Sequence, residues 1–387
     1  MKTLQQTATF LTIALAALFT ASCKKSTTEP EPQKQSIRTA VAYSTLTAAT
    51  PYASTFVVNG TTQSTVDFAA GNQRYRMFQA LNAYAGTGTT VAIDANILKN
   101  MFSNTGTPFT GTYVDLNGTA VQLKNIVASS LSATDAATVR TKIEADLTTM
   151  ATISLSTAVT ASRGTAGKLG TRIVDARGME TGQIIQKGLI GALQYDYIAN
   201  ILLTSGLDAD NYTLVSGKNY TQLEQNWDTA YGLLTLSPIY LAGSTDATRA
   251  TTEFALGSYI WEYNKDNYAK IYPAFLKGRA AIVNNDKAEL QAQATFIKTQ
   301  MEIAIAKAAV GYLEKWGTRT TDADRAHDIG EGGGFIYSLR FCKIKGADAA
   351  FSDGILTGLL SADGGMWDIT PTKIATATAA IKTKFSL

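Results

Sequence analysis

The stretch that decides the fold covers residues 287–316 and reads KAELQAQATFIKTQMEIAIAKAAVGYLEKW. Its apolar and small residues recur at spacings of three and four, which places them on one face of an α-helix. They are Leu290, Ala294, Ile297, Met301, Ile305, Ala308 and Tyr312. Asp286 and Glu289 form a capping-box pattern at the start, and Gly317 is a stop signal at the end. The pattern predicts a long helix that packs inside a bundle.

Helical patterns also fill most of the chain on both sides of this stretch. The segments with helical spacing or a start signal are 71–84, 94–102, 134–152, 179–203, 219–233, 246–264, 273–284, 321–342 and 371–385. Short connections between such segments are typical of a mainly all-α protein with a helical-bundle architecture. Within residues 55–62, Asn59-Gly60 stands between β-favouring residues, which predicts short β-hairpin elements near the N-terminus.

Some of these segments carry further signals. Thr134-Asp135 and Thr370-Pro371 are start signals for the helices that follow them. Gly188 and Gly191 lie on nearly one face of segment 179–203, where missing side chains would let another helix approach closely. The Gly- and Thr-rich stretch 153–178 is the place where the helical domain would divide if it holds two subdomains.

The first residues have the order of a bacterial lipoprotein signal. Lys2 precedes the apolar run Phe10–Phe19, and small residues then lead to Cys23. We expect residues 1–22 to be a signal peptide that is cleaved after Ser22, with a lipid attached to Cys23. The alternative is an uncleaved membrane anchor, but the apolar run is well short of the roughly 20 residues that a spanning helix needs.

Residues 23–40 are predicted to be a flexible tether, because the stretch from Lys24 to Ser36 contains no aliphatic or aromatic residue. We expect residues 41–387 to form a helical domain that a lipid holds at the membrane, on its periplasmic side or at the cell surface. The formal net charge is +3, with no basic block beyond Lys24-Lys25, so nucleic acid is not an expected partner.

The chain has one histidine, His327, and Glu331 follows it on the same face of a predicted helix. An imidazole and a carboxylate so placed can ligate one divalent metal ion, such as iron or zinc, or the carboxylate can orient the ring for proton transfer. The alternative is a helix-surface pair, or a buried histidine that its neighbour satisfies. A single histidine excludes the paired-histidine zinc motifs.

A second set of candidate ligand-binding residues lies on segment 179–203. Glu180, Gln183 and Lys187 are spaced by three and four along an otherwise apolar helix. Such a stripe either faces water or lines an interior polar site, and we expect the interior site. Asp228 is a further candidate because it adjoins Trp227, and a carboxylate beside an aromatic ring can form a pocket wall. The same pairing also occurs at the edge of a core.

Three consecutive glycines, Gly332 to Gly334, follow Glu331 directly. Each glycine inside a helix costs roughly 1 kcal/mol relative to alanine. A close helix contact, a local break in the helix or a backbone that approaches a ligand would account for them, and close packing is the commonest of the three.

Three motifs, together with the lipoprotein signal, resemble a family of uncharacterised bacterial lipoproteins that is similar to the imelysin-like proteins. The motifs are METGQIIQKGLIGA at 179–192, WDTAYG at 227–232 and RAHDIGEGGGFIYSLR at 325–340. The resemblance covers about residues 40–385. It implies a double helical bundle, exposure at the periplasm or cell surface, a link to iron uptake, and a Gly-x-His-x-x-Glu motif at the site. His327 matches the histidine of that motif, whereas Arg325 replaces its glycine and Glu331 stands four residues after the histidine rather than three.

Three functional hypotheses follow. The first is a non-enzymatic binding protein for iron or haem acquisition, with its ligand site around His327 and Glu331 and an outer-membrane receptor as a partner. The second is a metal-dependent hydrolase with Glu331 or Glu180 as general base, which requires Glu180, Asp228 and Glu262 to converge on His327. The third is a structural or receptor-partner lipoprotein without a small-molecule site, in which His327 is merely packed.

Overall fold

The computed structural model describes residues 36–234, 245, 247 and 254–387. Within it, Ser36–Leu387 form one compact unit. The predicted signal peptide 1–22, Cys23 and the first part of the predicted tether lie outside the described residues.

The domain begins earlier than the sequence predicts. The predicted tether extends to residue 40, but the Arg38 side chain is only 8% exposed and forms an ion pair with the fully buried Glu224. A buried carboxylate needs a charged or hydrogen-bonding partner, and here the partner comes from the end of the predicted tether. Polar composition alone does not reveal that role.

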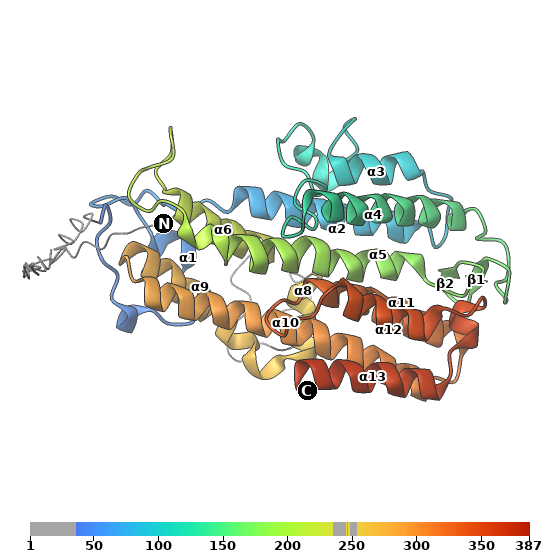
Figure 1. The fold of residues 1–387 in the computed structure, drawn as a ribbon. Coiled ribbons are helices and arrows are strands. Elements are labelled where there is room, and N and C mark those ends of the chain that lie inside the picture. Colours follow the sequence, from blue (N-terminus) through green and yellow to red (C-terminus); the bar gives the residue numbers. More distant parts are fainter. Residues whose placement is uncertain (1–35, 235–244, 246, 248–253) are drawn as a thin grey trace, which may run out of the picture. The chain divides into compact units, whose positions relative to one another are not determined.

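The fold is mainly helical, as predicted (Figure 1). The first half contains α1 (Tyr52–Thr55), α2 (Ala69–Thr87), α3 (Ala95–Ser103), α4 (Ala133–Ser154), α5 (Thr181–Leu189) and α6 (Gln222–Leu234), and a π-helical segment (Ile190–Leu202) continues α5. The second half contains α8 (Leu256–Tyr263), α9 (Lys265–Val283), α10 (Lys287–Thr318), α11 (Asp322–Ser338), α12 (Ala349–Leu360) and α13 (Pro371–Phe385).

Several boundaries differ from the predicted ones. Helix α9 begins at Lys265 and contains Pro273, where the sequence predicts a start. Helix α12 has no predicted counterpart, because Gly354 and Gly358 weaken its helical pattern. Part of the predicted helix 246–264 lies outside the described residues, and its described part is α8.

Side-chain caps fix several helix starts. The Asp286 side chain accepts a hydrogen bond from the Glu289 backbone N–H at 3.0 Å, as the capping pattern predicts. Thr370 caps α13 in the same way. Helix α4 is capped by Ser132, whose hydroxyl accepts from the Asp135 N–H at 3.2 Å, and not by Thr134.

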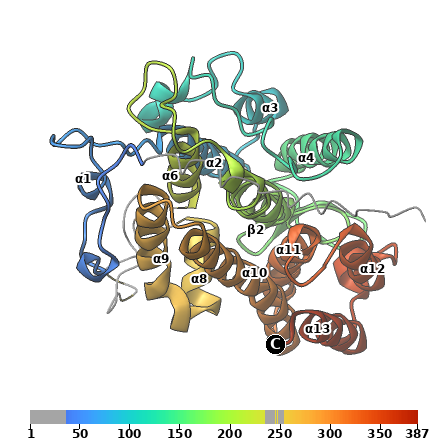
Figure 2. The same cartoon turned by 60° about the vertical axis from the view of Figure 1, so that its left-hand side comes forward.

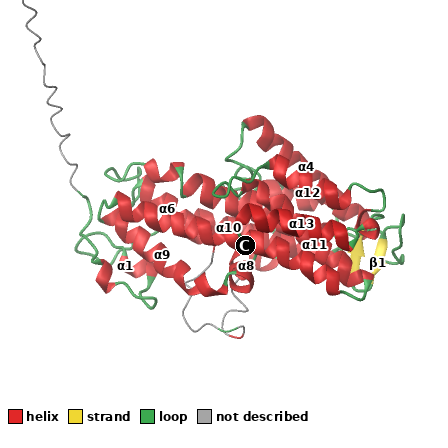
Figure 3. Cartoon of the chain, turned by 60° about the horizontal axis from the view of Figure 1, so that its bottom comes forward, coloured by secondary structure: helices red, strands yellow, loops and turns green. Residues whose placement is uncertain are grey.

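A small antiparallel sheet of two strands, β1 (Gly167–Leu169) and β2 (Arg172–Val174), lies at one end of the helices (Figure 3). The sequence predicts hairpins near the N-terminus instead. There, the turn around Asn59-Gly60 carries a single bridge between Val57 and Ser64, with Gly60 at a φ of 72°.

Helix α10 packs against α8, α9, α11 and α13, and Figure 2 shows it between them. The predicted divide at 153–178 does not separate the helices before it from those after it. Helix α2 packs closely on α6, and a Cβ on Gly232 would lie 2.6 Å from the backbone oxygen of Phe68. Among the described residues, no helix is long and apolar enough to span a membrane.

Candidate functional site

The candidate site lies where α5 packs against α11. Gly330 of α11 faces Glu180 at the start of α5, and Gly334, one turn further along α11, faces Lys187. Because residue numbers rise in the same direction along both helices, α5 and α11 run parallel.

Glycines on α11 allow this close approach. A Cβ on Gly334 would lie 2.6 Å from the Lys187 Cβ, and one on Gly330 would lie 3.1 Å from the Glu180 Cβ. Real Cβ atoms essentially never come within 3.0 Å of another heavy atom, so a side chain at Gly334 would push the helices apart. The close-contact explanation of the glycine run therefore holds for Gly334, whereas Gly333 has no heavy atom within 4 Å of its ideal Cβ.

The same contact continues beyond α5, as the two glycines on one face of segment 179–203 predict. A Cβ on Gly191 would clash with Ser338 of α11. The Ser338 hydroxyl donates to the backbone oxygen of Lys187 at 2.6 Å and accepts from the Gly191 N–H at 3.1 Å. These bonds fix the register of the two helices.

This register places His327 between two carboxylates. Its Nδ1 lies 2.8 Å from Glu180 Oε2, and its Nε2 lies 3.3 Å from Glu331 Oε1. The His327 side chain is 19% exposed and each glutamate side chain is 6% exposed. Each ring nitrogen of His327 thus has a carboxylate oxygen within reach, one from each of the two helices.

Lys187 joins the cluster from the next turns of α5. Its Nζ lies 3.1 Å from Glu331 Oε1 and donates to Gln183 Oε1 at 2.8 Å and to Gln186. Lys187 and Glu180 are buried and Gln183 is half-buried, so the stripe faces the contact with α11 and not open solvent. The tyrosine hydroxyl of Tyr259 on α8 donates to Glu331 Oε2 at 3.2 Å.

Burial and charge act in opposite directions on these groups. Burial lowers the pKa of the Lys187 ammonium, and the nearby Glu331 only partly offsets that effect. Burial alone would raise the pKa of Glu331, but the charge of Lys187 and a hydrogen bond from Tyr312 outweigh it and lower that pKa. Glu331 therefore stays ionised while it is buried.

As arranged, the side chains of the cluster bond to one another, so a metal ion would have to displace one of these contacts. In the part of the chain that the structure describes, no group of three His, Cys, Asp or Glu side chains is placed to hold a metal ion. The two nitrogens of His327 point toward different carboxylates. A metal ion bound to one nitrogen could therefore be shared with only one of the two carboxylates. The Lys187 ammonium also forms an ion pair with the Glu331 carboxylate. The metal pair His327 and Glu331 is close in space, but both members are engaged with other groups.

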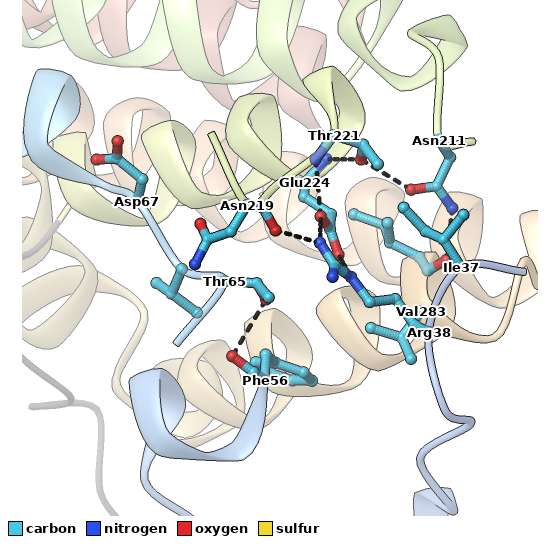
Figure 4. Close-up of polar contacts among 12 residues, drawn as sticks. Ile37, Arg38, Phe56, Thr65, Asp67, Asn211, Asn219, Thr221, Glu224 and Val283 are labelled. Atoms are coloured by element: carbon cyan, nitrogen blue, oxygen red, sulfur yellow. Dashed lines mark hydrogen bonds and ion pairs between the residues drawn. The ribbon is translucent and has the colours of Figure 1, made fainter. Parts of the chain in front are cut away.

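Asp228 lies in a separate buried cluster, so the structure does not bring it to His327. Its Oδ1 accepts from Arg279 Nε at 3.1 Å and from the Tyr52 hydroxyl at 2.8 Å. Arg279 also bonds to Glu224 Oε1 at 2.9 Å. Arg38 bonds to the same carboxylate (Figure 4). Burial raises the pKa of Asp228 to about 6, although the Arg279 charge opposes it. Two arginines and two carboxylates neutralise each other here, as buried charges require.

Glu262 is likewise engaged elsewhere. Its carboxylate forms an ion pair with Lys315 Nζ at 3.0 Å, and its side chain is 44% exposed. Of the carboxylates that a hydrolase was expected to gather around His327, Glu180 lies within hydrogen-bonding distance, whereas Asp228 and Glu262 have other partners.

Sequence reasoning missed several members of the site, among them Tyr312, which bonds to Glu331. Tyr259 comes from α8, Gln186 from α5, and Arg172 from β2, where its Nη1 lies 3.7 Å from Glu180 Oε1. Gln186 could have been found, because it stands three residues after Gln183 and directly before Lys187. Tyr259 and Arg172 are distant in sequence and follow no spacing that connects them to His327.

A family model described as a domain of unknown function (DUF4856) matches residues 51–387. That range contains every residue of the α5–α11 cluster. No curated protein and no solved structure matches the chain.

Proposed function

The chain belongs to the DUF4856 family, a domain of unknown function, and we propose that it is a non-enzymatic, lipid-anchored binding protein of the bacterial envelope. Its ligand site is the α5–α11 cluster of Glu180, Lys187, His327 and Glu331. The ligand is an iron species or haem, which the protein takes up as part of iron acquisition.

One observation carries this proposal. The α5–α11 cluster brings together two carboxylates, an ammonium group and an imidazole from two distant segments. They meet where glycines on α11 allow the two helices to approach closely. Burying several charges together stabilises a fold poorly compared with an apolar contact of the same size. Groups kept at such a cost are candidates for function, because functional sites are seldom optimised for stability.

His327 is the member that a ligand would reach first. Its side chain is 19% exposed, against 6% or less for Glu180, Glu331 and Lys187. An imidazole is a common ligand of iron in proteins, both as the free ion and in haem. Iron as the ligand class rests on the resemblance to imelysin-like proteins. A metal would have to displace one of the two carboxylates from a ring nitrogen.

The envelope location rests on the first residues of the chain. The apolar run, the small residues and Cys23 together favour export and lipidation. The membrane is then the first partner, through the lipid, and an outer-membrane receptor is the partner that would pass an iron ligand onward.

A structural role for the cluster is the second candidate. The observation that favours it is that the side chains of His327, Glu331 and Lys187 each contact another member of the cluster. In that case the chain is a structural or receptor-partner lipoprotein. His327 would then stabilise the α5–α11 contact without binding any ligand.

Calorimetric titration of the purified protein with ferrous iron, zinc and haem distinguishes the two candidates. We expect saturable binding of an iron species that is lost in His327→Ala. Arg163→Ala is a matched control, since Arg163 forms an exposed ion pair with Asp368 outside the cluster. Absence of binding by the wild-type protein to all three probes would leave the structural role standing.

A further inference from the structure

A second site lies outside the α5–α11 cluster, where residues 36–41 cross the domain without regular secondary structure. Two asparagine side chains hold the main chain of this segment. Asn59 accepts from the Thr39 N–H at 2.8 Å and donates to the Ile37 carbonyl at 3.2 Å. Asn284 accepts from the Val41 N–H and donates to the Val41 carbonyl, both at 2.8 Å. Side-chain amides that pair with a backbone in this way hold a segment independently of its side chains.

Arg38 supplies the specific contact. Its Nε donates to Glu224 Oε1 at 3.0 Å, its Nη2 donates to Glu224 Oε2 at 2.7 Å, and Nη2 also donates to the Asn219 carbonyl at 2.5 Å (Figure 4). The two parallel bonds to one carboxylate require the planar fork of a guanidinium group. A lysine at this position would offer a single point charge.

The Glu224 carboxylate and the Asn219 carbonyl form a socket for the Arg38 guanidinium group. Groups other than Arg38 also hold this carboxylate in position. Arg279, which is fully buried, bonds to Glu224 Oε1 at 2.9 Å, and the Thr221 N–H donates to Glu224 Oε2 at 2.8 Å. The carboxylate is therefore held in place by groups of α6, α9 and the turn before α6. A carboxylate that other groups already hold in place is preorganised for an incoming guanidinium group.

A pocket also borders the segment. It has a volume of about 290 Å³, and Arg38, Val41, Phe56 and Thr65 are among the residues that line it. Val41 packs against the edge of the core, and the other contacts that hold the segment are polar.

We propose that Glu224, Asn219, Asn59 and Asn284 form a binding site for a peptide segment that carries an arginine. The occupant is this chain's own segment Ser36–Val41, at the start of the domain. We call this segment the clasp, because it can detach from the site and bind to it again. This site uses none of the residues of the α5–α11 cluster, so it stands or falls separately from the proposed iron binding.

The test uses Arg38→Ala in the full chain. Amide hydrogen exchange should become at least about tenfold faster at Thr39 and Val41, whose N–H groups bond to Asn59 and Asn284, while the amides of α10 keep their wild-type rates. Arg163→Ala, which removes an exposed arginine, should leave all these rates unchanged.

Binding in trans is the second measurement. The synthetic peptide acetyl-Ser-Ile-Arg-Thr-Ala-Val-amide should bind to Arg38→Ala saturably in calorimetry, and the wild-type protein should not bind it because its socket is filled. The same peptide with lysine in place of arginine should bind at least about tenfold more weakly.

Unchanged exchange at Thr39 and Val41 in Arg38→Ala, or equal binding of the arginine and lysine peptides, would overturn the proposal. If Arg38→Ala does not unfold cooperatively, Asn59→Ala replaces it, because this substitution loosens the main-chain contact without touching the buried charges. Faster exchange at Thr39 then supports the clasp, and wild-type exchange at Thr39 contradicts it.

Discussion

His327 Nδ1 lies 2.8 Å from Glu180 Oε2, although 147 residues separate the two in the chain. The contact depends on the parallel packing of α5 and α11, which brings the start of one helix beside the first turns of the other. The His327–Glu180 pair is therefore part of the candidate site and also part of the contact between α5 and α11.

A double-mutant cycle measures how strongly this pair is coupled. We expect Glu180→Gln and His327→Gln to be non-additive by about 1–3 kcal/mol in the free energy of unfolding, because both groups are largely buried and lie within hydrogen-bonding distance of each other. Chemical denaturation of the wild type, both single variants and the double variant gives this coupling energy.

The pair Lys142 and Asp146 on the surface of α4 is the control for that cycle, and its coupling should stay at or below about 0.5 kcal/mol. Equal coupling energies in the two pairs would show that the His327–Glu180 contact is no stronger than a solvent-exposed ion pair on a helix surface.

Two neighbouring glycines of α11 should respond to alanine in opposite directions. Gly334→Ala should destabilise the domain by about 1–3 kcal/mol, because the new methyl group would meet Lys187 Cβ at 2.6 Å. Gly333→Ala meets no atom within 4 Å and should stabilise the helix by up to about 1 kcal/mol. Thermal melting of both variants checks the prediction, and a destabilised Gly333→Ala would show that the close contact is not where we place it.

The ionisation of Glu331 should appear in the pH dependence of stability. Its pKa in the folded protein is lowered from the ordinary value of 4.5, so the ionised carboxylate contributes stability at pH values above about 4.5. That contribution disappears as the pH falls through the lowered folded-state pKa. Urea denaturation between about pH 3 and 7 should show a steeper acid loss for the wild type than for Glu331→Gln. Identical slopes would mean that Glu331 is not held ionised by Lys187 and its other neighbours.

Lipidation is a separate prediction from the first residues. Mass spectrometry of membrane-extracted protein should find an acylated N-terminal Cys23, and Cys23→Ala should release the protein from the membrane or block its processing. Cys342→Ala is the control, because Cys342 is a fully buried thiol of the domain and should not affect anchoring. An unmodified mature N-terminus elsewhere in the chain would refute the lipid anchor.

The sequence predicts the long helices well because their signal is local and repeated. Residues 287–316 carry the same apolar spacing over many turns, and α10 covers them. The hairpin at β1 and β2 was missed because its turn at Gly170-Thr171 lacks the Asn-Gly signal that marks the turn at Asn59-Gly60. The π-helical continuation of α5 follows the same apolar pattern as an α-helix, so its type could not be predicted from periodicity.

Members of the site could be identified singly, but their pairing could not. The polar stripe Glu180, Gln183 and Lys187 and the pair His327 and Glu331 each stand out against apolar surroundings. Which of them meet depends on the register of α5 and α11, which a single sequence does not encode in any local spacing. Asp228 looked equivalent, but its partner Arg279 stands on α9, and a lone arginine in the apolar run of that helix is the signal that could have indicated a buried ion pair.

The central claim, that His327 binds a ligand rather than only stabilising the packing, is tested most directly by melting wild type and His327→Ala with and without an iron species or haem. A ligand that binds only the folded state stabilises it by RT ln(1 + L/Kd), where L is the free ligand concentration, so the melting temperature rises with the affinity and the concentration of the ligand. We predict that the ligand raises the melting temperature of the wild-type protein and does not change that of His327→Ala, which without ligand melts only a few degrees below the wild type because it loses the contact with Glu180. No ligand-induced shift in the wild-type protein, together with a large drop in the melting temperature of His327→Ala, would contradict the claim.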